Sequence, residues 1–384
     1  MMLRYLSAGE SHGKGLTAII EGLPAGFLLD KAWIDQQLAK RQGGYGRGGR
    51  MKIEHDEVEF LAGLRNGLTM GSPLCLMIHN RDWANWEEIM NSAPGAAIDE
   101  KQVTLPRPGH ADLAGGIKYR QKDLRNILER ASARETAIRV AVGAVAQSIL
   151  SQFGISVRGH VVSLGGIQAQ VERTLVNEAL YDTPLYCTDA QASERMTQAI
   201  DQAKAQGDSL GGVVEVLAEG LPIGLGSHVQ PDRKLDGRLA QALMSIQAIK
   251  GVEIGGGFQS AYLPGSQVHD EIFYAPEQGY YHQTNHCGGL EGGMTNGETL
   301  IIRAAMKPIP TLYKPLHSVD WLSKKEGEAS VERSDACAVP AAAIVAENAV
   351  AWTILDAFLE KFSGDHADEI MSHYQHYLEY VRQV

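Results

Sequence analysis

Residues 107–140 place a histidine, a carboxylate and several arginines around a predicted helix start. Ser132 is followed three residues later by Glu135 and then by an apolar run, which is the capping-box pattern of a helix N-terminus. Arg130 and Arg134 flank that start, so their guanidinium groups would join free backbone N–H groups and the positive end of the helix dipole. The arrangement predicts a phosphate or carboxylate site, while a capped helix whose arginines pair with surface carboxylates explains it equally well.

Two histidines occur in predicted loops. His12 sits between glycines in the turn GESHG, and His110 follows a proline-rich stretch, two residues before Asp112. A loop histidine is suited to proton transfer or anion contact near neutral pH. Because a single loop histidine is more often inert than catalytic, this interpretation depends on other candidate groups lying nearby.

The segment 41–51, RQGGYGRGGRM, carries Arg41, Arg47 and Arg50 among glycines. Taken alone it resembles an RNA-binding Gly-Arg patch, in which arginines stack on bases or pair with phosphates. The net charge of −11 and the pI of about 5.6 disfavour nucleic-acid binding, which needs a basic face. We therefore interpret the segment as a glycine-framed loop that brings arginines to a small polyanionic ligand.

The composition predicts a globular cytoplasmic protein. The chain has 384 residues, 44% of them apolar, which is enough for one large or two medium domains. It shows neither an apolar run near 18 residues nor a secretory h-region, so we expect no membrane span and no signal peptide. The four cysteines are scattered without a CxxC pair, which favours reduced thiols over a disulfide framework or a metal site.

Hydrophobic patterning predicts the elements that would position these residues. We expect strands on both sides of the GESHG turn, a helix over 30–41, a buried strand at 72–80 and a buried helix over 137–153. Further on we expect a helix over 239–249, a helix whose first turn holds Pro340, and a surface helix past residue 365.

Two similar segments suggest an internal duplication. TAIIEGLPAG at 17–26 and GGVVEVLAEGLPIGLG at 211–226 each read as a strand that leads into a Gly-Leu-Pro turn. We therefore predict two related units within a single domain over 1–384, at about 1–160 and 210–360. Residues 166–208 are polar and weakly periodic, so we expect a peripheral helical insert without chemistry.

Eight ordered blocks carry a stronger signal than any single motif. The blocks are GESHG (9–13), RQGGYGRGGRM (41–51), RPGHADLAGGIKY (107–119), RASARETA (130–137), MSIQAIKGVEIGGGF (244–258), TNHCGGLEGGMTNG (284–297), MKPIPT (306–311) and ERSDACAVPAA (332–342). With them the chain resembles the chorismate synthase family from Leu3 to about Leu359. The resemblance implies an α+β fold, a β-α-β sandwich of two similar halves, and usually a homotetramer.

The resemblance also implies an activity: anti-1,4-elimination of phosphate from 5-enolpyruvylshikimate 3-phosphate, giving chorismate, with reduced FMN required and no net redox change. The residue content fits this demand, because a phosphorylated dicarboxylate and a flavin phosphate need a dense arginine pocket. Some members of the family also reduce their own flavin with NADPH.

Residue roles follow from the matching blocks. His12 and His110 would supply protons, one to the flavin and one to the departing phosphate, and Asp335 would help to remove the ring C6 proton, directly or through flavin N5. The substrate-binding positions are Arg41, Arg47, Arg107, Arg134 and Arg333, of which Arg41 and Arg47 are also candidates for NADPH. The flavin positions are Arg130, Ala131, Ser132, Gln247, Ala248, Gly292, Lys307, Pro308, Ile309, Pro310, Thr311 and Arg333.

Two blocks depart from the family pattern. His286-Cys287 stands where many relatives have Arg-Ala, and RSDACAVPAA stands where many have RHDPCVVPRA. Three other interpretations stay open at this point: a catalytically dead flavin- or phosphate-binding protein, an RNA-binding protein, and an NADPH-dependent flavin reductase. The presence of His12, His110 and Asp335 counts against the first, and the net charge counts against the second.

Overall fold

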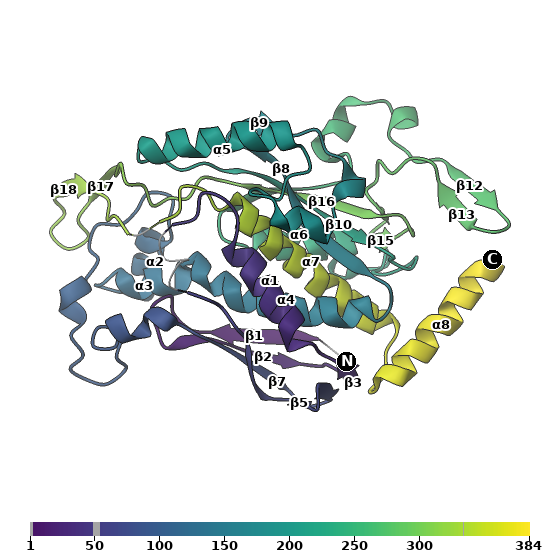
Figure 1. Cartoon of the computed structure of the whole chain (residues 1–384), viewed down its shortest axis with the longest axis horizontal. Helices are drawn as coiled ribbons and strands as arrows, with labels where there is room; N and C mark the ends of the chain where they lie inside the picture. The colour runs from purple at the N-terminus through teal and green to yellow at the C-terminus, as the bar shows by residue number, and fades with distance from the viewer. Residues whose placement is uncertain (1–2, 49–53, 333) are drawn as a thin grey trace.

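Two antiparallel sheets with helices between them form the body of the chain (Figure 1). The computed structural model describes residues 3–48, 54–332 and 334–384. The first sheet has the order β1 (Arg4–Ala8), β2 (Gly15–Glu21), β7 (Leu74–His79), β4 (Glu59–Ala62). The second has the order β11 (Ile249–Ile254), β16 (Leu300–Met306), β10 (Gly212–Glu219), β8 (Ser156–Leu164), β9 (Ile167–Gln168).

Four helices fill the space between the sheets: α1 (Lys31–Gln42), α4 (Thr136–Ser151), α6 (Leu235–Met244) and α7 (Val339–Lys361). Helix α4 packs on β2 and β7, α7 packs on β8 and β10, and the two helices pack on each other. Alternate residues of β7, such as Leu74, Leu76 and Ile78, are buried on the helix-facing side. The result is the helix layer between two sheets that the resemblance implies.

Helix α7 is apolar all round because it has neighbours on every side. By length and composition it could cross a membrane, although Glu347 and Asn348 interrupt its apolar residues. However, 83% of its most apolar 18-residue window is buried within the protein. Among the described residues it is the one helix of this kind, and its burial is that of a core helix.

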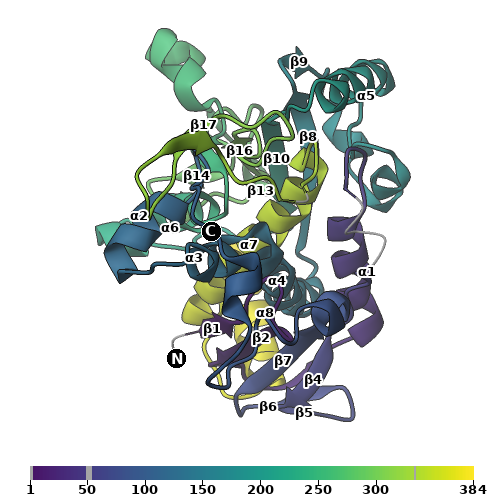
Figure 2. The ribbon, with the colours of Figure 1, turned by 90° about the vertical axis from the view of Figure 1, so that its left-hand side faces the viewer.

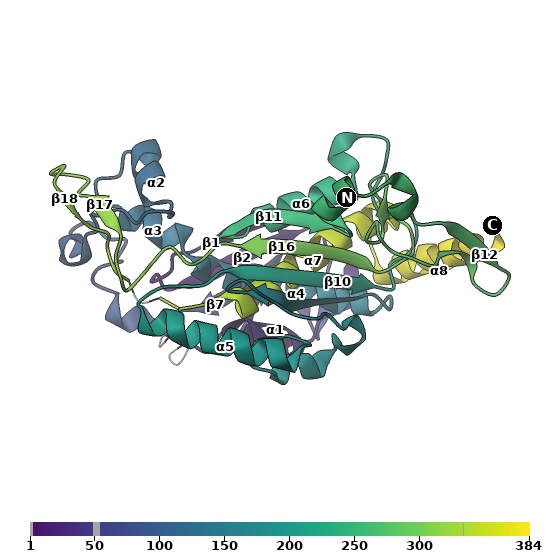
Figure 3. The ribbon, with the colours of Figure 1, turned by 90° about the horizontal axis from the view of Figure 1, so that it is seen from above.

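Smaller elements lie at the two ends of the sandwich (Figures 2 and 3). At one end are α2 (Asp112–Tyr119), α3 (Arg125–Ala131) and the hairpin β17 (His317–Val319) and β18 (Glu326–Glu328). The hairpin β12 (Ile272–Ala275) and β13 (Gly279–His282) lies at the other. The remaining elements are β3 (Ala25–Leu28), β5 (Leu64–Arg65), β6 (Leu68–Met70), β14 (Leu290–Glu291), β15 (Met294–Thr295), α5 (Ala190–Ala205) and α8 (Ala367–Gln383).

Most of the predicted elements are confirmed, including the helix over 30–41, the strand at 72–80 and the helix that holds Pro340 in its first turn. The helix over 239–249 is wrong at both ends. It begins at Leu235 and stops at Met244, and Ile249 already belongs to β11. The turn between them includes Ala248, whose φ of 67° is left-handed and incompatible with a continuing helix.

The two Gly-Leu-Pro turns share one hydrogen-bond arrangement. Thr69 Oγ1 donates to the carbonyl of Pro24 (2.7 Å) and accepts from the N–H of Phe27, three residues after that proline. In the same way Thr295 Oγ1 donates to the carbonyl of Pro222 (2.6 Å) and accepts from the N–H of Leu225. Internal duplication stays a prediction, which this match supports. Within the predicted insert, Tyr181 donates to buried Glu347 of α7 (2.7 Å), so the segment also contacts the core.

Candidate active site

The turn that carries His12 is hydrogen-bonded to the end of α3 and to Ser132, just before α4. The backbone N–H of Ser11 donates to the carbonyl of Glu129 (3.0 Å), and its hydroxyl bonds Ser132 (3.2 Å). Asn80, just after β7, donates to the carbonyl of Gly13 (2.7 Å) and accepts from Arg134 Nε (2.9 Å). Segments far apart in the sequence therefore meet around this helix start.

The predicted capping box forms only in half. Ser132 Oγ accepts from the N–H of Arg134 (3.2 Å), which caps a short 3-10 turn, Ala133–Glu135, that leads into α4. The Glu135 side chain instead accepts from Ser7 (3.2 Å) and Gln247 (3.2 Å). It thus joins the first strand to the turn before β11.

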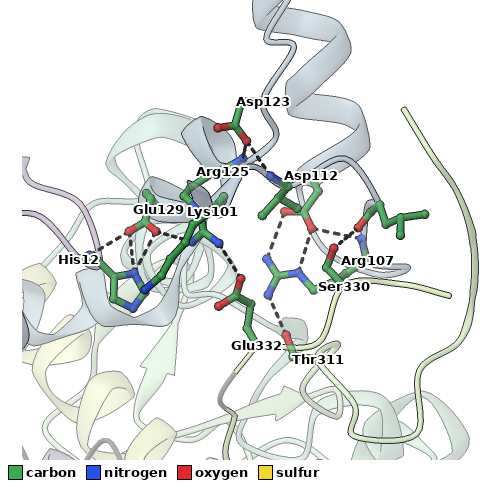
Figure 4. Close-up of polar contacts among 12 residues, drawn as sticks. His12, Lys101, Arg107, Asp112, Asp123, Arg125, Glu129, Thr311, Ser330 and Glu332 are labelled. Atoms are coloured by element: carbon green, nitrogen blue, oxygen red, sulfur yellow. Dashed lines mark hydrogen bonds and ion pairs between the residues drawn. The ribbon is translucent and has the colours of Figure 1, made fainter. Parts of the chain in front are cut away.

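His12 is held by a buried carboxylate (Figure 4). Its Nδ1 lies 2.9 and 3.0 Å from the two carboxylate oxygens of Glu129, and its backbone N–H donates to Oε2 (2.8 Å). The ring stacks on Trp86 with 3.9 Å between centroids. Burial opposes the charge on Glu129, but the hydrogen bonds from His12 and the charge of Arg125 outweigh it and lower the pKa of the carboxyl.

His110 has a similar partner. Its Nδ1 lies 2.5 Å from Asp112 Oδ1 and 2.9 Å from Arg107 Nη2. Arg107 also donates from Nε to Asp112 Oδ2 (2.9 Å) and from Nη1 to Thr311 Oγ1 (2.8 Å). Asp112 is fully buried, which opposes its charge, yet the hydrogen bonds from His110 and Arg107 hold the pKa of its carboxyl well below the usual range.

Two of the predicted substrate arginines share one buried carboxylate. Arg134 Nη1 donates to both oxygens of Asp56 (2.7 Å each), and Arg41 Nη1 lies 3.6 Å from Asp56 Oδ2. Arg41 Nε also donates to Thr136 Oγ1 (2.9 Å). Burial lowers the pKa of Arg41 to about 9, with Asp56 opposing the shift and Arg134 adding to it.

Asp335 lies beside this arginine cluster. Its carboxylate accepts from the backbone N–H of Gly48 (2.6 Å) and pairs with Arg47 Nη1 (2.7 Å). The negative charge of Asp335 also interacts with the Arg41 guanidinium group and opposes the lowering of the Arg41 pKa. Asp335, Arg41, Arg47 and Arg134 therefore lie together, whereas Arg333 and Arg50 fall outside the described residues.

Most of the predicted flavin positions gather at the same end. Arg130 donates to the carbonyls of Ser7 (3.0 Å) and Gly9 (3.1 Å). Lys307 donates from its backbone to Ala248 (3.0 Å) and from Nζ to the carbonyl of Gly109 (2.5 Å), so its loop lies against the His110 segment.

The residues in this area fit a flavin. Gln247 Oε1 is buried and has no hydrogen-bond partner among the described residues, so it is available to an N–H donor of a bound ring system. Ala248 beside it is held at a positive φ, a strained backbone of the kind that gathers at functional sites. Arg130 and Lys307 would supply positive charge for a phosphate.

Gly292 is separated from the other predicted flavin positions. It lies between β14 and β15, where Gly289 packs against the Leu300 end of β16. Lys307 follows the opposite end of that strand. The seven residues of β16 span about 20 Å, so within its own chain Gly292 lies far from the flavin positions that follow the other end of this strand.

Sequence reasoning missed Glu129, Trp86, Asn80 and Asp56. Each contacts a candidate residue that lies far away along the chain. Glu129 did carry a signal, since it follows Arg125 at i,i+4 on a helix and forms an ion pair with it (3.1 Å). The others have no local pattern that marks them.

Comparisons with known proteins identify the family of the chain. The family model described as chorismate synthase matches residues 3–359. The chorismate synthases of Desulforamulus reducens and Moorella thermoacetica are each 60% identical, over 387 and 385 residues, and cover all of both chains. A solved structure entitled "Crystal Structure of Chorismate Synthase" is 44% identical, with a TM-score of 0.80, and covers 100% of this chain and 99% of its own. The fold, the gathered site residues and these matches together show that the chain belongs to the chorismate synthase family.

Proposed function

We propose that this lyase eliminates phosphate from 5-enolpyruvylshikimate 3-phosphate to give chorismate, using reduced FMN without net redox change. Family membership supports the reaction. The structural observation that supports it best is that both histidines bond a buried carboxylate through Nδ1 at the same end of the sandwich. The elimination needs a proton acceptor at ring C6 and proton donors at the leaving phosphate and the cofactor, and these groups answer that need.

The proton acceptor in this proposal is Asp335. The ion pair with Arg47 and the hydrogen bond from Gly48 hold its carboxylate beside the arginine cluster that would bind the substrate. His12 and His110 are the proton donors, one toward the departing phosphate and the other toward the cofactor. In both, Nδ1 is bonded to a carboxylate, so proton donation proceeds from Nε2.

The substrate carries two carboxylates and a phosphate, and we assign them to Arg47, Arg107, Arg41, Arg134 and Arg333. Guanidinium forks bind such groups with two parallel hydrogen bonds. Because Arg41 and Arg134 already contact Asp56, a substrate oxyanion would have to compete with that carboxylate or share the donors with it. Arg41 and Arg47 are also the proposed contacts for NADPH.

When bound, reduced FMN supplies electron density that helps the C–O bond to break. We propose that it is held by Arg130, Ala131, Ser132, Gln247, Ala248, Arg333 and the segment 307–311, with Gln247 Oε1 as an acceptor. Gly292 would contact the flavin of another copy, in a homotetramer. We place the enzyme in the cytoplasm.

The test is anaerobic turnover of 5-enolpyruvylshikimate 3-phosphate with dithionite-reduced FMN, followed by chorismate absorbance. We expect chorismate from the wild type and a loss of about 10²-fold or more in His110→Asn. A second reaction with NADPH as the sole reductant tests flavin reduction by the enzyme itself. Folded protein that binds FMN but makes no chorismate would favour the catalytically dead binding protein, and NADPH oxidation without substrate would favour a flavin reductase.

A further inference from the structure

We propose that Glu129 is a positioning residue, which fixes the ring orientation and the tautomer of His12. In this arrangement Nδ1 carries a proton toward the carboxylate, and proton exchange with a bound ligand takes place at Nε2. The inference rests on the proposed function only where it treats His12 as catalytic. The arrangement itself is a property of the chain without its cofactor.

One carboxylate holds both the backbone and the ring of His12. Oε2 of Glu129 accepts from the backbone N–H (2.8 Å), and both oxygens lie within 3.0 Å of Nδ1. Contact with the backbone fixes where the side chain begins, and contact with Nδ1 fixes how the ring is turned. A carboxylate has no donor when ionised, so it selects the form of the ring that carries hydrogen on Nδ1.

Glu129 is itself held rigidly. Its side chain is 1% exposed and pairs with Arg125 Nη1 (3.1 Å) on the same helix α3. Arg125 also donates from Nη2 to Glu332 (2.9 Å) and from Nε to the carbonyl of Lys101 (2.5 Å). Figure 4 shows these contacts around one guanidinium group. A carboxylate fixed in this way can orient the ring without moving itself.

An aromatic ring covers the His12 face. Trp86 stacks on it with an angle of 26° between the planes, and Trp86 Nε1 donates to Asp82 (3.2 Å). Lys101 Nζ lies 3.7 Å from the Trp86 centroid. Among the described residues, charged groups placed against His12 directly or through Trp86 include Glu129, Arg125, Lys101 and Asp82. Of these four, Glu129 bonds the imidazole.

Asp123 provides a matched control just before the same helix, two residues ahead of its first residue Arg125. Its Oδ1 accepts from the backbone N–H groups of Val103 (2.9 Å) and Arg125 (2.9 Å), so it anchors the start of α3. Asp123→Asn removes the charge of an anchoring carboxylate, as Glu129→Gln does. It therefore reports what weakening α3 does to the enzyme without changing the partner of the ring.

The experiment compares Glu129→Gln, Glu129→Asp and Asp123→Asn. We expect Glu129→Gln to lower kcat by about 10²-fold with a much smaller change in KM, because the ring is misdirected while substrate contacts remain. The second readout is the pH dependence of His12 modification by diethyl pyrocarbonate in FMN-free protein, followed by peptide mass spectrometry. Its midpoint should move to lower pH in Glu129→Gln, since a buried negative charge beside the imidazolium is lost.

Glu129→Asp keeps the charge, so its midpoint should stay close to that of the wild type, and so should the midpoint of Asp123→Asn. The proposal is overturned if Glu129→Gln loses activity with an unchanged midpoint, or if Asp123→Asn loses as much kcat. If Glu129→Gln does not fold, Glu129→Asp decides, because its shorter side chain should lower kcat at an unchanged midpoint. If the wild type makes no chorismate, the proposed function fails, while the FMN-free measurement still tests the pairing of Glu129 with His12.

Discussion

At the scale of single residues, the site repeats one unit: a histidine, a buried carboxylate bonded to its Nδ1, and an arginine bonded to that carboxylate. The arginine is Arg107 in one unit and Arg125 in the other. Burying a lone carboxylate is costly, so the hydrogen bonds from the histidine, together with the arginine, are what allow each carboxylate to stay charged. The pair of carboxylates thereby controls how both candidate proton donors are oriented.

Asp112→Asn should therefore damage both stability and activity. It leaves the guanidinium group of Arg107 buried with its main charge partner removed, which typically costs about 3–5 kcal/mol. We expect a large drop in the free energy of unfolding by urea and a fall in kcat of about 10²-fold or more. Asp99→Asn, at an exposed position, should change stability by no more than about 0.5 kcal/mol. Equal stability of the two variants would contradict the unit described above.

At the scale of elements, local signals in the sequence predict the helices that carry caps. Asp30 caps α1 by accepting from the N–H of Ala32 (2.9 Å), and Pro340 begins α7. Local sequence signals do not predict where a helix ends when a contact with a distant residue determines the backbone conformation. Helix α6 ends early because Ala248 adopts a left-handed conformation, and its carbonyl accepts from Lys307, 59 positions away. No pattern near residue 248 contains that information.

The same distinction explains the site. The histidines and arginines are recognisable by type and by motif, and all of those that the structure describes lie at one end of the sandwich. Asn80 and Asp56 are recognisable only in three dimensions, because each bonds Arg134 across more than fifty positions. Charge partners of this kind depend on how strands and helices come together.

The crossing of α4 and α7 gives an element-scale prediction. A Cβ added at Gly143 of α4 would lie 2.3 Å from the carbonyl oxygen of Asn348, so Gly143→Ala must push the helices apart. We expect a loss of about 1–3 kcal/mol in urea unfolding. Gly237→Ala in α6 is the control, since its nearest atom is 3.9 Å away and alanine favours helix, with an effect between zero and about 1 kcal/mol of stabilisation. Similar losses in both variants would mean that the helices do not meet so closely.

At the scale of the whole molecule, charged carboxylates are buried at separate places. Asp112 and Glu129 lie at the site, Glu215 on β10, and Asp270 before β12. Burial opposes their charges, yet hydrogen bonds from their partners lower the pKa of all four. A lowered pKa in the folded state contributes stability that is complete above the ordinary carboxyl pKa of about 4 and is lost as the pH falls below it.

We therefore expect the urea midpoint to be nearly constant from pH 7 to 5 and to fall steeply below about pH 4. Glu347 and Asp356 act in the opposite direction, because burial raises the pKa of both carboxyl groups, so protonating them favours the folded state. The four buried carboxylates with a lowered pKa outnumber these two, and the net change should be a loss of stability in acid. An unfolding midpoint that does not change down to pH 3 would contradict the ionised state of these carboxylates.

The position of Gly292 gives a prediction about assembly. Within its own chain the nearest side-chain atom to an added Cβ is 3.9 Å away, so Gly292→Trp should fold, with the modest strain of a left-handed φ. If Gly292 contacts the flavin of a neighbouring copy, a tryptophan there blocks that copy's site, and Gly292→Trp is inactive. Gly279→Trp, at another left-handed glycine with open space around it, should keep its activity.

Co-expression separates a contact between copies from a defect within one chain. A subunit with Gly292→Trp retains its histidines, and a subunit with His110→Asn retains Gly292, so neither forms an active enzyme alone. In a hybrid oligomer, the intact His110 of the first subunit can meet the intact Gly292 of the second, and activity should return. Purification on two different tags isolates the hybrids for the chorismate assay. Inactive hybrids would mean that Gly292 serves its own chain, and the flavin site would then have to be complete within a single copy.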